Sequence, residues 1–261
     1  MAPLPFRRLA GNCGVEVPGM DVRAVDDTTM GELRDLVARH AVVVLPRQHL
    51  EPEDEIAFAS RWGVPHSRPG HSPIIALDST DTRRDRPRGG GWHSDMSWAP
   101  TTPYATLLHA LTIPDVGGDT IIANQCAAYD SLPDRLRSQI EGRSAEHRHP
   151  NPPGRFAAGT VVHPIVRVIP ETGHRALFVN PAFTQRICDM SEPESRRVLW
   201  QLYRFATRPE VTYRHCWSAG DLVVWDNRCV VHYAIHDYTD PRLMHRITVK
   251  TAHSAMTHQP T

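Results

Sequence analysis

Residues 220–238 read GDLVVWDNRCVVHYAIHDY. Residues 222–225 (LVVW) form a short apolar run that predicts a buried strand, and the polar run 226–228 (DNR) is typical of a turn. The chain then enters Val230-Val231-His232, so His232 lies at the start of a strand that returns from a tight turn. The stretch therefore predicts two neighbouring strands, with a histidine that can face into the mouth of a barrel.

A second short motif, Trp92-His93-Ser94-Asp95, lies far upstream of this stretch. If the motif is extended, His93 and Asp95 are two residues apart and point to the same face, so they can bind one ion together. Two histidines and one carboxylate on one face of an octahedron leave three positions open, as in non-haem Fe(II) oxygenases. With His232 as the third ligand, the sequence predicts a mononuclear metal site that joins the early strands to the last ones.

Two arginines follow His232 and support its choice as the third ligand. Arg242 and Arg246 are four residues apart, so in an extended strand they share one face. Other histidines compete for the same role, but none lies beside both a turn and a following arginine at a comparable distance. They are His236, His245 and the pair His147 and His149.

The rest of the chain predicts an α+β protein, mainly β, with a jelly-roll (double-stranded β-helix) core and flanking helices. The predicted strands are 41–45, 105–110, 119–123, 163–169, 176–179, 211–216, 222–225 and 243–251. The predicted helices are 29–40, 52–62, 127–140 and 193–206. Prolines, glycines and four arginines surround one strand-like segment, 73–77, and make residues 63–91 a long loop, predicted to be an active-site lid. We expect one domain, 1–261.

The composition argues against several classes of protein. Lys plus Arg equals Asp plus Glu at 29 each, so no global field favours nucleic acid or a membrane surface. The five cysteines are scattered and contain no CxxC pair, which favours reduced thiols and a cytoplasmic location. No run of about 18 apolar residues is present. We expect a cytoplasmic homo-oligomer, a dimer or tetramer, that acts on a small molecule.

Taken together, these blocks resemble the taurine dioxygenase / 2,4-dichlorophenoxyacetate dioxygenase family of Fe(II)/2-oxoglutarate oxygenases. The resemblance runs from about Gly14 to Lys250 in several blocks that keep their order. The blocks are AVVVLPRQ, WHSD, PDVGGDT, HPIVRVIPETGHRALFVN, GDLVVWDNRCVVHYAIHDY and RLMHRITV.

The resemblance implies a role for each matching residue. His93, Asp95 and His232 would be the iron ligands, while Thr120 and Arg242 would hold the distal carboxylate of 2-oxoglutarate. A planar, always-charged arginine suits a carboxylate, and a hydroxyl donor adds a charge-assisted hydrogen bond.

The resemblance also implies contacts with the cosubstrate and the substrate. Arg246 matches a second arginine at the site, which faces the anionic group of the substrate in sulfonate-using relatives. His66 and Phe183 lie in segments that should border the pocket.

The implied activity is hydroxylation of a small anionic organic substrate with Fe(II), 2-oxoglutarate and O2, releasing succinate and CO2. Asp95 fills the position that halogenating relatives leave to a small residue, so hydroxylation is favoured over halogenation. Gly89-Gly90-Gly91 stands where taurine dioxygenases carry an asparagine, which argues against taurine as substrate. Alkyl sulfates, aryloxyalkanoates and amino-acid-derived metabolites remain open.

Three alternatives remain beside this interpretation. One keeps fold and cofactors but ends in desaturation or another oxidative tailoring of an amino-acid-derived metabolite. A second is a non-redox metal hydrolase with the same three ligands. A third is a catalytically silent binding protein. Arg242 with Thr120 separates the oxygenase from the hydrolase, because a hydrolase has no general need for them.

Overall fold

The computed structural model describes residues 4–67, 69–81, 91–150 and 159–251. A mixed eight-stranded sheet has the order β1-β2-β3-β14-β6-β16-β4, with β5 also paired to β16. Within this sheet β2 and β3 pair in parallel, and the other described pairs are antiparallel. Its strands are β1 (Arg7–Arg8), β2 (Val15–Glu16), β3 (Val42–Leu45), β4 (Val64–Pro65), β5 (Ile75–Asp78), β6 (Ala105–Thr112), β14 (Leu222–Asp226) and β16 (Leu243–Lys250).

Two helices, α1 (Asp27–His40) and α2 (Pro52–Trp62), cover the outer face of this large sheet. Their apolar residues pack on the outward-pointing side chains of β3, β6, β14 and β16, since alternate strand residues point to opposite faces. The N-cap of α1 is Asp26, whose side chain accepts a hydrogen bond from the Thr29 backbone at 2.8 Å.

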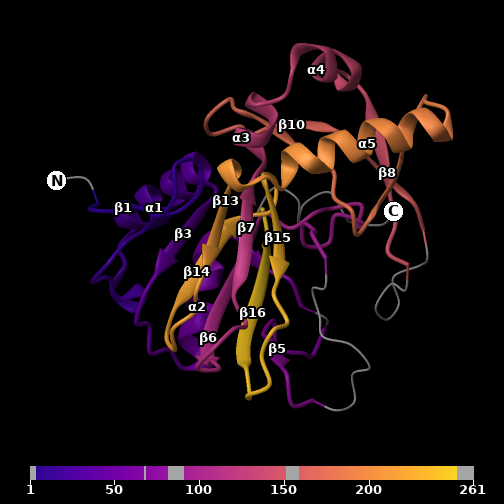
Figure 1. Ribbon diagram of the computed structural model, residues 1–261. Helices are drawn as coiled ribbons and strands as arrows, with labels where there is room; N and C mark the ends of the chain where they lie inside the picture. The colour runs from indigo at the N-terminus through magenta and orange to yellow at the C-terminus, as the bar shows by residue number, and fades with distance from the viewer. Residues whose placement is uncertain (1–3, 68, 82–90, 151–158, 252–261) are drawn as a thin grey trace.

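A second sheet, with the order β13-β7-β15, packs on the inner face of the large sheet (Figure 1). Its strands are β13 (Thr212–His215), β7 (Thr120–Asn124) and β15 (Val230–Ala234). Ile122 and Val230 from this sheet share a buried cluster with Val44, Leu108 and Trp225 from the large one. The predicted jelly-roll arrangement of two facing sheets is therefore present, and its core lies between them.

A third region of short strands and helices lies beyond one end of the two sheets (Figure 1). It contains a three-stranded sheet, β12-β8-β9, and a two-stranded one, β10-β11. The elements are α3 (Gln125–Asp130), α4 (Asp134–Ile140), β8 (Ser144–His147), β9 (Val161–Pro164), β10 (Val166–Val168), β11 (Arg175–Leu177), β12 (Thr184–Ile187) and α5 (Glu192–Ala206). Two 3₁₀ turns complete the chain, η1 (Val22–Ala24) and η2 (Pro209–Val211).

The sequence predicted most of these elements but merged two pairs. The helix expected at 127–140 is α3 and α4, separated at Pro133, which starts α4 and lacks the N–H to continue a helix. The strand expected at 163–169 is β9 and β10, because the chain changes partner from β8 to β11 at Ile165. Strands β1, β2, β4, β8 and β12 were not predicted.

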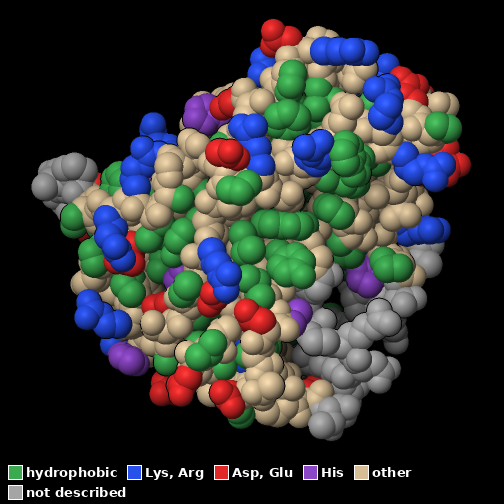
Figure 2. Space-filling model, in the orientation of Figure 1, with side chains coloured by type: hydrophobic (Ala, Val, Ile, Leu, Met, Phe, Trp, Pro, Cys, Tyr) green, Lys and Arg blue, Asp and Glu red, His purple; other side chains and the backbone are tan. Residues whose placement is uncertain are grey.

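The predicted lid, 63–91, contains β4 and β5, so part of it belongs to the large sheet. Its basic segment, 82–90, lies outside the described residues. The part of the chain that the structure describes contains no helix long and apolar enough to cross a membrane. All five cysteines are described and none forms a disulfide. On the face drawn in Figure 2, acidic and basic side chains are interspersed, in keeping with the zero net charge.

Candidate active site

His93 and His232 are joined through their backbones. The His93 N–H donates to the His232 carbonyl at 3.0 Å, and the His232 N–H donates to the His93 carbonyl at 2.8 Å. Residues that exchange both hydrogen bonds of an antiparallel pair lie directly opposite each other, so their side chains leave on the same face. The two imidazole centroids are accordingly 4.2 Å apart. Through this bridge, His93 pairs with the edge of β15 that faces away from β7.

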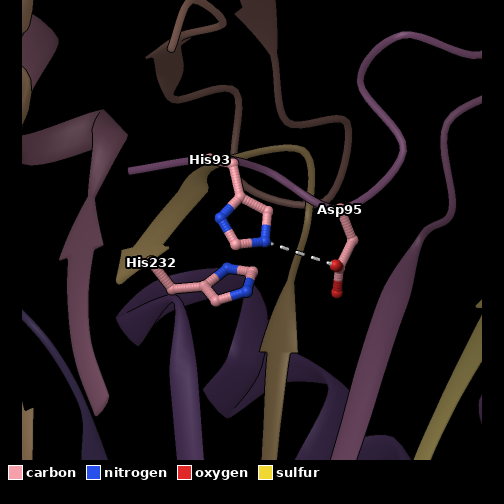
Figure 3. A group of neighbouring side chains, drawn as sticks. All are labelled: His93, Asp95 and His232. Atoms are coloured by element: carbon pink, nitrogen blue, oxygen red, sulfur yellow. Dashed lines mark ion pairs between the residues drawn. The ribbon is translucent and has the colours of Figure 1, made fainter. Parts of the chain in front are cut away.

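Asp95 completes a group of three that points toward one centre (Figure 3). Its Oδ1 lies 3.8 Å from Nε2 of His93, and one ligand atom from each residue lies within 4.8 Å of the others. Two donors on one ion with bonds of about 2.1 Å can lie at most about 4.2 Å apart, so a small inward movement suffices. Among the described residues, this is the only such group of histidine, cysteine and acidic side chains.

The histidine nitrogens are suitably prepared for a metal. Nδ1 of His93 lies 2.9 Å from the Gly91 carbonyl, which can only accept, so that nitrogen carries the hydrogen and Nε2 keeps its lone pair. No hydrogen bond of the described residues engages the ring of His232, and its Nδ1 is fully buried. Burial, with the charges of His93 and Arg246, lowers the pKa of His232 to about 3 against the opposing effect of Asp95. His232 is therefore neutral and has a lone pair to offer.

Asp95 is ionised although it is buried. Burial alone would raise its pKa, but Arg246, His232 and His93, with a hydrogen bond from Thr106, hold the pKa at about 2. The Thr106 hydroxyl donates to Oδ2 at 2.7 Å, and Nη1 of Arg246 donates to Oδ1 at 3.2 Å. Arg246 thus lies beside the carboxylate of the group, a contact that the sequence had not suggested.

Arg242 lies just before β16 and is also buried, at 7% exposure. Its Nε donates to the Gly118 carbonyl at 3.1 Å, and its guanidinium lies 5.8 Å from the centre of the Tyr238 ring. Among the described residues, no carboxylate forms an ion pair with it, and burial lowers its pKa against the opposing effects of Tyr238 and Asp119. A buried guanidinium without an ion pair is costly, so this position is prepared for an anion.

Gly118 makes room for Arg242. Its φ of +74° is a left-handed conformation that side chains disfavour, and a Cβ there would lie 3.2 Å from both Cδ and Nε of Arg242. The even spacing of Arg242 and Arg246 does not carry through the strand, because the register of β16 shifts between Leu243 and Met244. Both arginines nonetheless contact residues outside the large sheet, Gly118 and Asp95.

Thr120, the first residue of β7, is 2% exposed. Its Oγ1 accepts a hydrogen bond from Nε1 of Trp217 at 3.0 Å. An indole can only donate, so the Thr120 hydroxyl keeps its own hydrogen for another acceptor. The Thr120 hydroxyl can therefore serve as a donor to a bound anion, and Trp217 is a contributor that the sequence did not reveal.

Phe183 packs against the group of three, whereas His66 contacts β16. The Phe183 ring packs edge-on against His93 with centroids 6.0 Å apart, and His149 stacks on Phe183 at 5.2 Å. Trp98 meets His149 in turn at 5.2 Å, which makes an aromatic wall beside His93. His66 lies near the end of β16, where its backbone N–H donates to the Thr248 carbonyl at 2.8 Å.

Another pair of histidines with a carboxylate lies on the outer face of the large sheet. Nδ1 of His109 lies 2.7 Å from Oε1 of Glu55, and its Nε2 lies 2.9 Å from the Gln48 carbonyl. Nδ1 of His245 lies 3.0 Å from Oε2 of the same glutamate. Glu55 and His109 are 4% and 3% exposed. This outer cluster, Glu55, His109 and His245, is closed by its own hydrogen bonds.

The site thus combines a compact group of metal donors, a buried cation without a counter-ion, and an aromatic wall. The sequence predicted the three donors, Thr120, both arginines and Phe183. It missed Thr106 and Trp217, which act through other residues. A threonine in the mainly apolar run ATLLHAL was the available signal for the first.

The chain is similar to known proteins over most of its length. Residues 5–248 match the family described as taurine catabolism dioxygenase TauD, TfdA family. The chain is 32% identical to an (S)-phenoxypropionate/alpha-ketoglutarate dioxygenase of Sphingobium herbicidovorans, over 88% of this chain and 89% of that protein. It is 32% identical to an alpha-ketoglutarate-dependent sulfate ester dioxygenase of Pseudomonas putida, over 94% and 89%.

Solved structures show the same likeness. The fold superposes on a crystal structure of a taurine dioxygenase from Burkholderia xenovorans with a TM-score of 0.85 and 33% identity, covering 95% of this chain and 91% of that one. The jelly-roll prediction is therefore confirmed.

Proposed function

The chain belongs to the taurine catabolism dioxygenase TauD, TfdA family, and from this premise we propose that His93, Asp95 and His232 bind Fe(II) in a 2-oxoglutarate-dependent dioxygenase. The names of the two relatives include alpha-ketoglutarate, which is another name for 2-oxoglutarate. The enzyme hydroxylates a small organic anion. Thr120 and Arg242 hold 2-oxoglutarate, and Arg246 with Phe183 borders the substrate.

The donor set suits a divalent iron. One ionised carboxylate and two neutral imidazoles are ligands of intermediate hardness, and they leave one side of the ion open. The states of Asp95 and His232 agree, since Asp95 has a pKa of about 2 and His232 a pKa of about 3. The carbonyl of Gly91 orients His93 in the way that second partners of metal-bound histidines commonly do.

The observation that carries the proposal is the buried Arg242 without an ion-pair partner among the described residues. A dicarboxylate whose far end reaches Arg242 supplies the missing counter-ion. The hydroxyl of Thr120 can donate a further hydrogen bond, because Trp217 occupies one of its acceptor positions. A hydrolase that uses the same three ligands would gain nothing from a buried cation here.

Bound Fe(II), with O2 and 2-oxoglutarate, supplies the oxidation that hydroxylates a C–H bond and releases succinate and CO2. The residues of the chain bind, orient and exclude water. Trp225 and Ile122 are at most 1% exposed, and the Trp225 ring lies 4.8 Å from that of His232. This apolar lining excludes water from one side of the site.

The substrate is proposed to be an anion with an apolar body. Arg246 is only partly buried, and its Nε has no partner among the described residues, so it has donors to spare beside the contact with Asp95. Phe183 and the aromatic wall offer an apolar surface next to His93. The relatives named for phenoxypropionate and sulfate esters act on compounds of this kind.

The direct test is formation of succinate from 2-oxoglutarate by the Fe(II)-loaded enzyme, with a panel of carboxylates, sulfonates and sulfate esters. Arg242→Lys should raise the KM for 2-oxoglutarate by about 10–100-fold, since a charge-assisted hydrogen bond contributes about 1.5–3 kcal/mol. Arg204→Lys, an exposed arginine on α5, is the matched control.

Three outcomes separate the alternatives. Succinate formation that depends on one class of anion identifies the substrate class. Hydrolysis of an ester without consumption of 2-oxoglutarate would support the metal hydrolase instead. Metal binding without any turnover across the panel would favour the silent binding protein.

Other expectations remain proposals. We infer one domain, a homo-oligomer of two or four chains, a cytoplasmic location, and no binding of nucleic acid or membranes. Light scattering after size-exclusion chromatography measures the mass in solution, and limited proteolysis tests for a second stable unit.

A further inference from the structure

Thr106 is a lone hydroxyl in the inner row of β6. The inner row continues with Leu108 and Ala110, which belong to the core between the two sheets. Thr106 itself is fully buried, and its hydroxyl is 2.7 Å from Oδ2 of Asp95. A buried hydroxyl is tolerated only with partners, so its contacts are specific.

The direction of each hydrogen bond around Thr106 follows from one indole. Nε1 of Trp225 can only donate, and it lies 3.0 Å from Oδ1 of Asn227, so that atom of the amide must be the oxygen. The amide nitrogen of Asn227 then faces Thr106 and donates to its oxygen at 2.8 Å. The single hydrogen of the Thr106 hydroxyl is left for Asp95.

The turn after β14 keeps Asn227 in place. Asp226 accepts from the Arg228 backbone at 2.8 Å and forms an ion pair with its guanidinium at 2.6 Å. The Asn227 backbone N–H donates to the Tyr104 carbonyl at 2.9 Å, and Asn227 is fully buried. The DNR turn therefore points one amide inward at a fixed position.

The consequence falls on the carboxylate of Asp95. With Oδ2 committed to Thr106 by the shorter hydrogen bond, Oδ1 is the atom that faces Nε2 of His93, and it also accepts from Nη1 of Arg246 at 3.2 Å. The Trp225 ring also packs against the His232 ring, with centroids 4.8 Å apart. Trp225 therefore contacts one donor directly and orients Asp95 through Asn227 and Thr106. Trp225 and Thr106 are directly paired in β14 and β6, which fixes their relative positions.

We propose that Thr106, oriented by Asn227 and Trp225, is a positioning residue that makes Asp95 a one-oxygen metal ligand. The inference rests on the proposed metal site. A carboxylate that bound through both oxygens would take one of the positions that 2-oxoglutarate and O2 require. The hydrogen-bond chain therefore preserves the open side of the metal as well as its affinity.

The test uses Co(II) as the probe, because its binding and visible spectrum report affinity and coordination without turnover. Thr106→Val keeps the shape and removes the hydroxyl, and Thr106→Ser restores it. We expect Thr106→Val to weaken Co(II) binding by about 10–100-fold and to change the spectrum. Thr106→Ser should return both to near the wild-type values.

Thr248→Val is the matched control. Thr248 is 4% exposed and directly opposite Thr106 on β16, so its replacement disturbs the same packing without touching Asp95. We expect it to bind Co(II) as the wild type does. Asn227→Ala, which leaves the Thr106 hydroxyl in place but unoriented, should fall between the wild type and Thr106→Val, and it serves if Thr106→Val does not fold.

The inference is overturned if Thr106→Val or Asn227→Ala binds Co(II) with wild-type affinity and spectrum, or if Thr248→Val weakens binding as much. The proposed function fails separately. Wild-type protein that binds no Co(II), or whose binding survives His232→Ala, would reject the metal site itself.

Discussion

The described residues include two groups of two histidines and one carboxylate, which lie on opposite faces of the same sheet. His93, Asp95 and His232 meet on the inner face, while Glu55, His109 and His245 meet on the outer face under α2. In the outer cluster the glutamate binds both rings, and His109 also contacts the Gln48 carbonyl. In the inner group no hydrogen bond of the described residues engages the ring of His232.

The difference shows that residue types alone do not make a metal site. The outer cluster has the right side chains, but its hydrogen bonds already occupy both carboxylate oxygens of Glu55, both ring nitrogens of His109 and Nδ1 of His245. The inner group directs its donor atoms at a common centre and leaves Nε2 of His93 and the ring of His232 without a hydrogen bond among the described residues, although Asp95 accepts from Thr106 and Arg246. Free donor capacity in a buried place is therefore the physical mark of the site.

The largest expected effect tests this contrast directly. His232→Ala should weaken binding of Fe(II) or Co(II) by more than about 100-fold and abolish succinate formation, since even partners of the ligands are commonly worth 10–100-fold. His245→Ala should leave metal binding unchanged. Titration followed by visible absorption measures both, and equal losses in the two variants would contradict the assignment.

The second expected effect is a loss of stability, without a change in metal binding, when the outer cluster is altered. Glu55→Ala leaves His109 buried without its carboxylate, so we expect the free energy of unfolding to fall by about 3–5 kcal/mol. Metal affinity of the folded protein should not change. Urea denaturation of this variant is compared with that of Glu53→Ala, an exposed neighbour on α2. Loss of less than about 1 kcal/mol would show that the outer cluster contributes little.

The third effect concerns pH and the metal-free protein. The pKa of His232 is about 3 in the folded chain and about 6.5 in an unfolded one. Between these values the unfolded chain holds a proton that the folded chain lacks, so stability falls as the pH is lowered from about 6.5, by up to about 1.4 kcal/mol per unit.

His232→Gln should therefore make the decline between pH 6.5 and about 4.5 shallower. Denaturant unfolding across this range, with the metal removed by chelation, gives the slope. His174→Gln, which changes an exposed histidine, is the reference. A slope that stays at the wild-type value would mean that His232 titrates normally.

The smallest expected effect compares the contributions of His245 and Glu55 to the stability of the outer cluster. His245 supplies only one of the contacts of Glu55 and is partly exposed. His245→Gln should lower the free energy of unfolding by about 1 kcal/mol, well below the effect of Glu55→Ala. Thermal unfolding in parallel with Glu55→Ala ranks the two, and a larger loss in His245→Gln would contradict the ranking.

Sequence periodicity predicted the elements that carry a strong local pattern. α2 begins and ends where its apolar spacing indicates, and β3, β6, β7, β13, β14 and β16 were each placed within two residues at either end. β8 and β12 escaped because SAEH and TQRI mix polar and apolar residues, and pairing with each other and with β9 stabilises them. Local pattern does not report such partners.

The site was predictable where chemistry is concentrated in short motifs. His93 and Asp95 share one motif, and His232 follows a marked turn. The outer cluster was not predictable, since Glu55 and His245 are far apart in sequence and meet only because α2 packs on β16. Thr106 and Asn227 were hidden for the same reason, because hydrogen bonding to Asp95 is a property of the assembled sheets.

The position of β14 has a consequence for synthesis of the chain on the ribosome. β14 is inserted between β3 and β6, so these two strands stand with an open edge until residues 222–226 have been translated. At roughly 5–20 residues per second, the stretch from Thr112 to Leu222 takes several seconds to make. During that interval the nascent chain exposes apolar strand edges that can pair with other molecules, so β3 and β6 are the segments for which a chaperone would be needed.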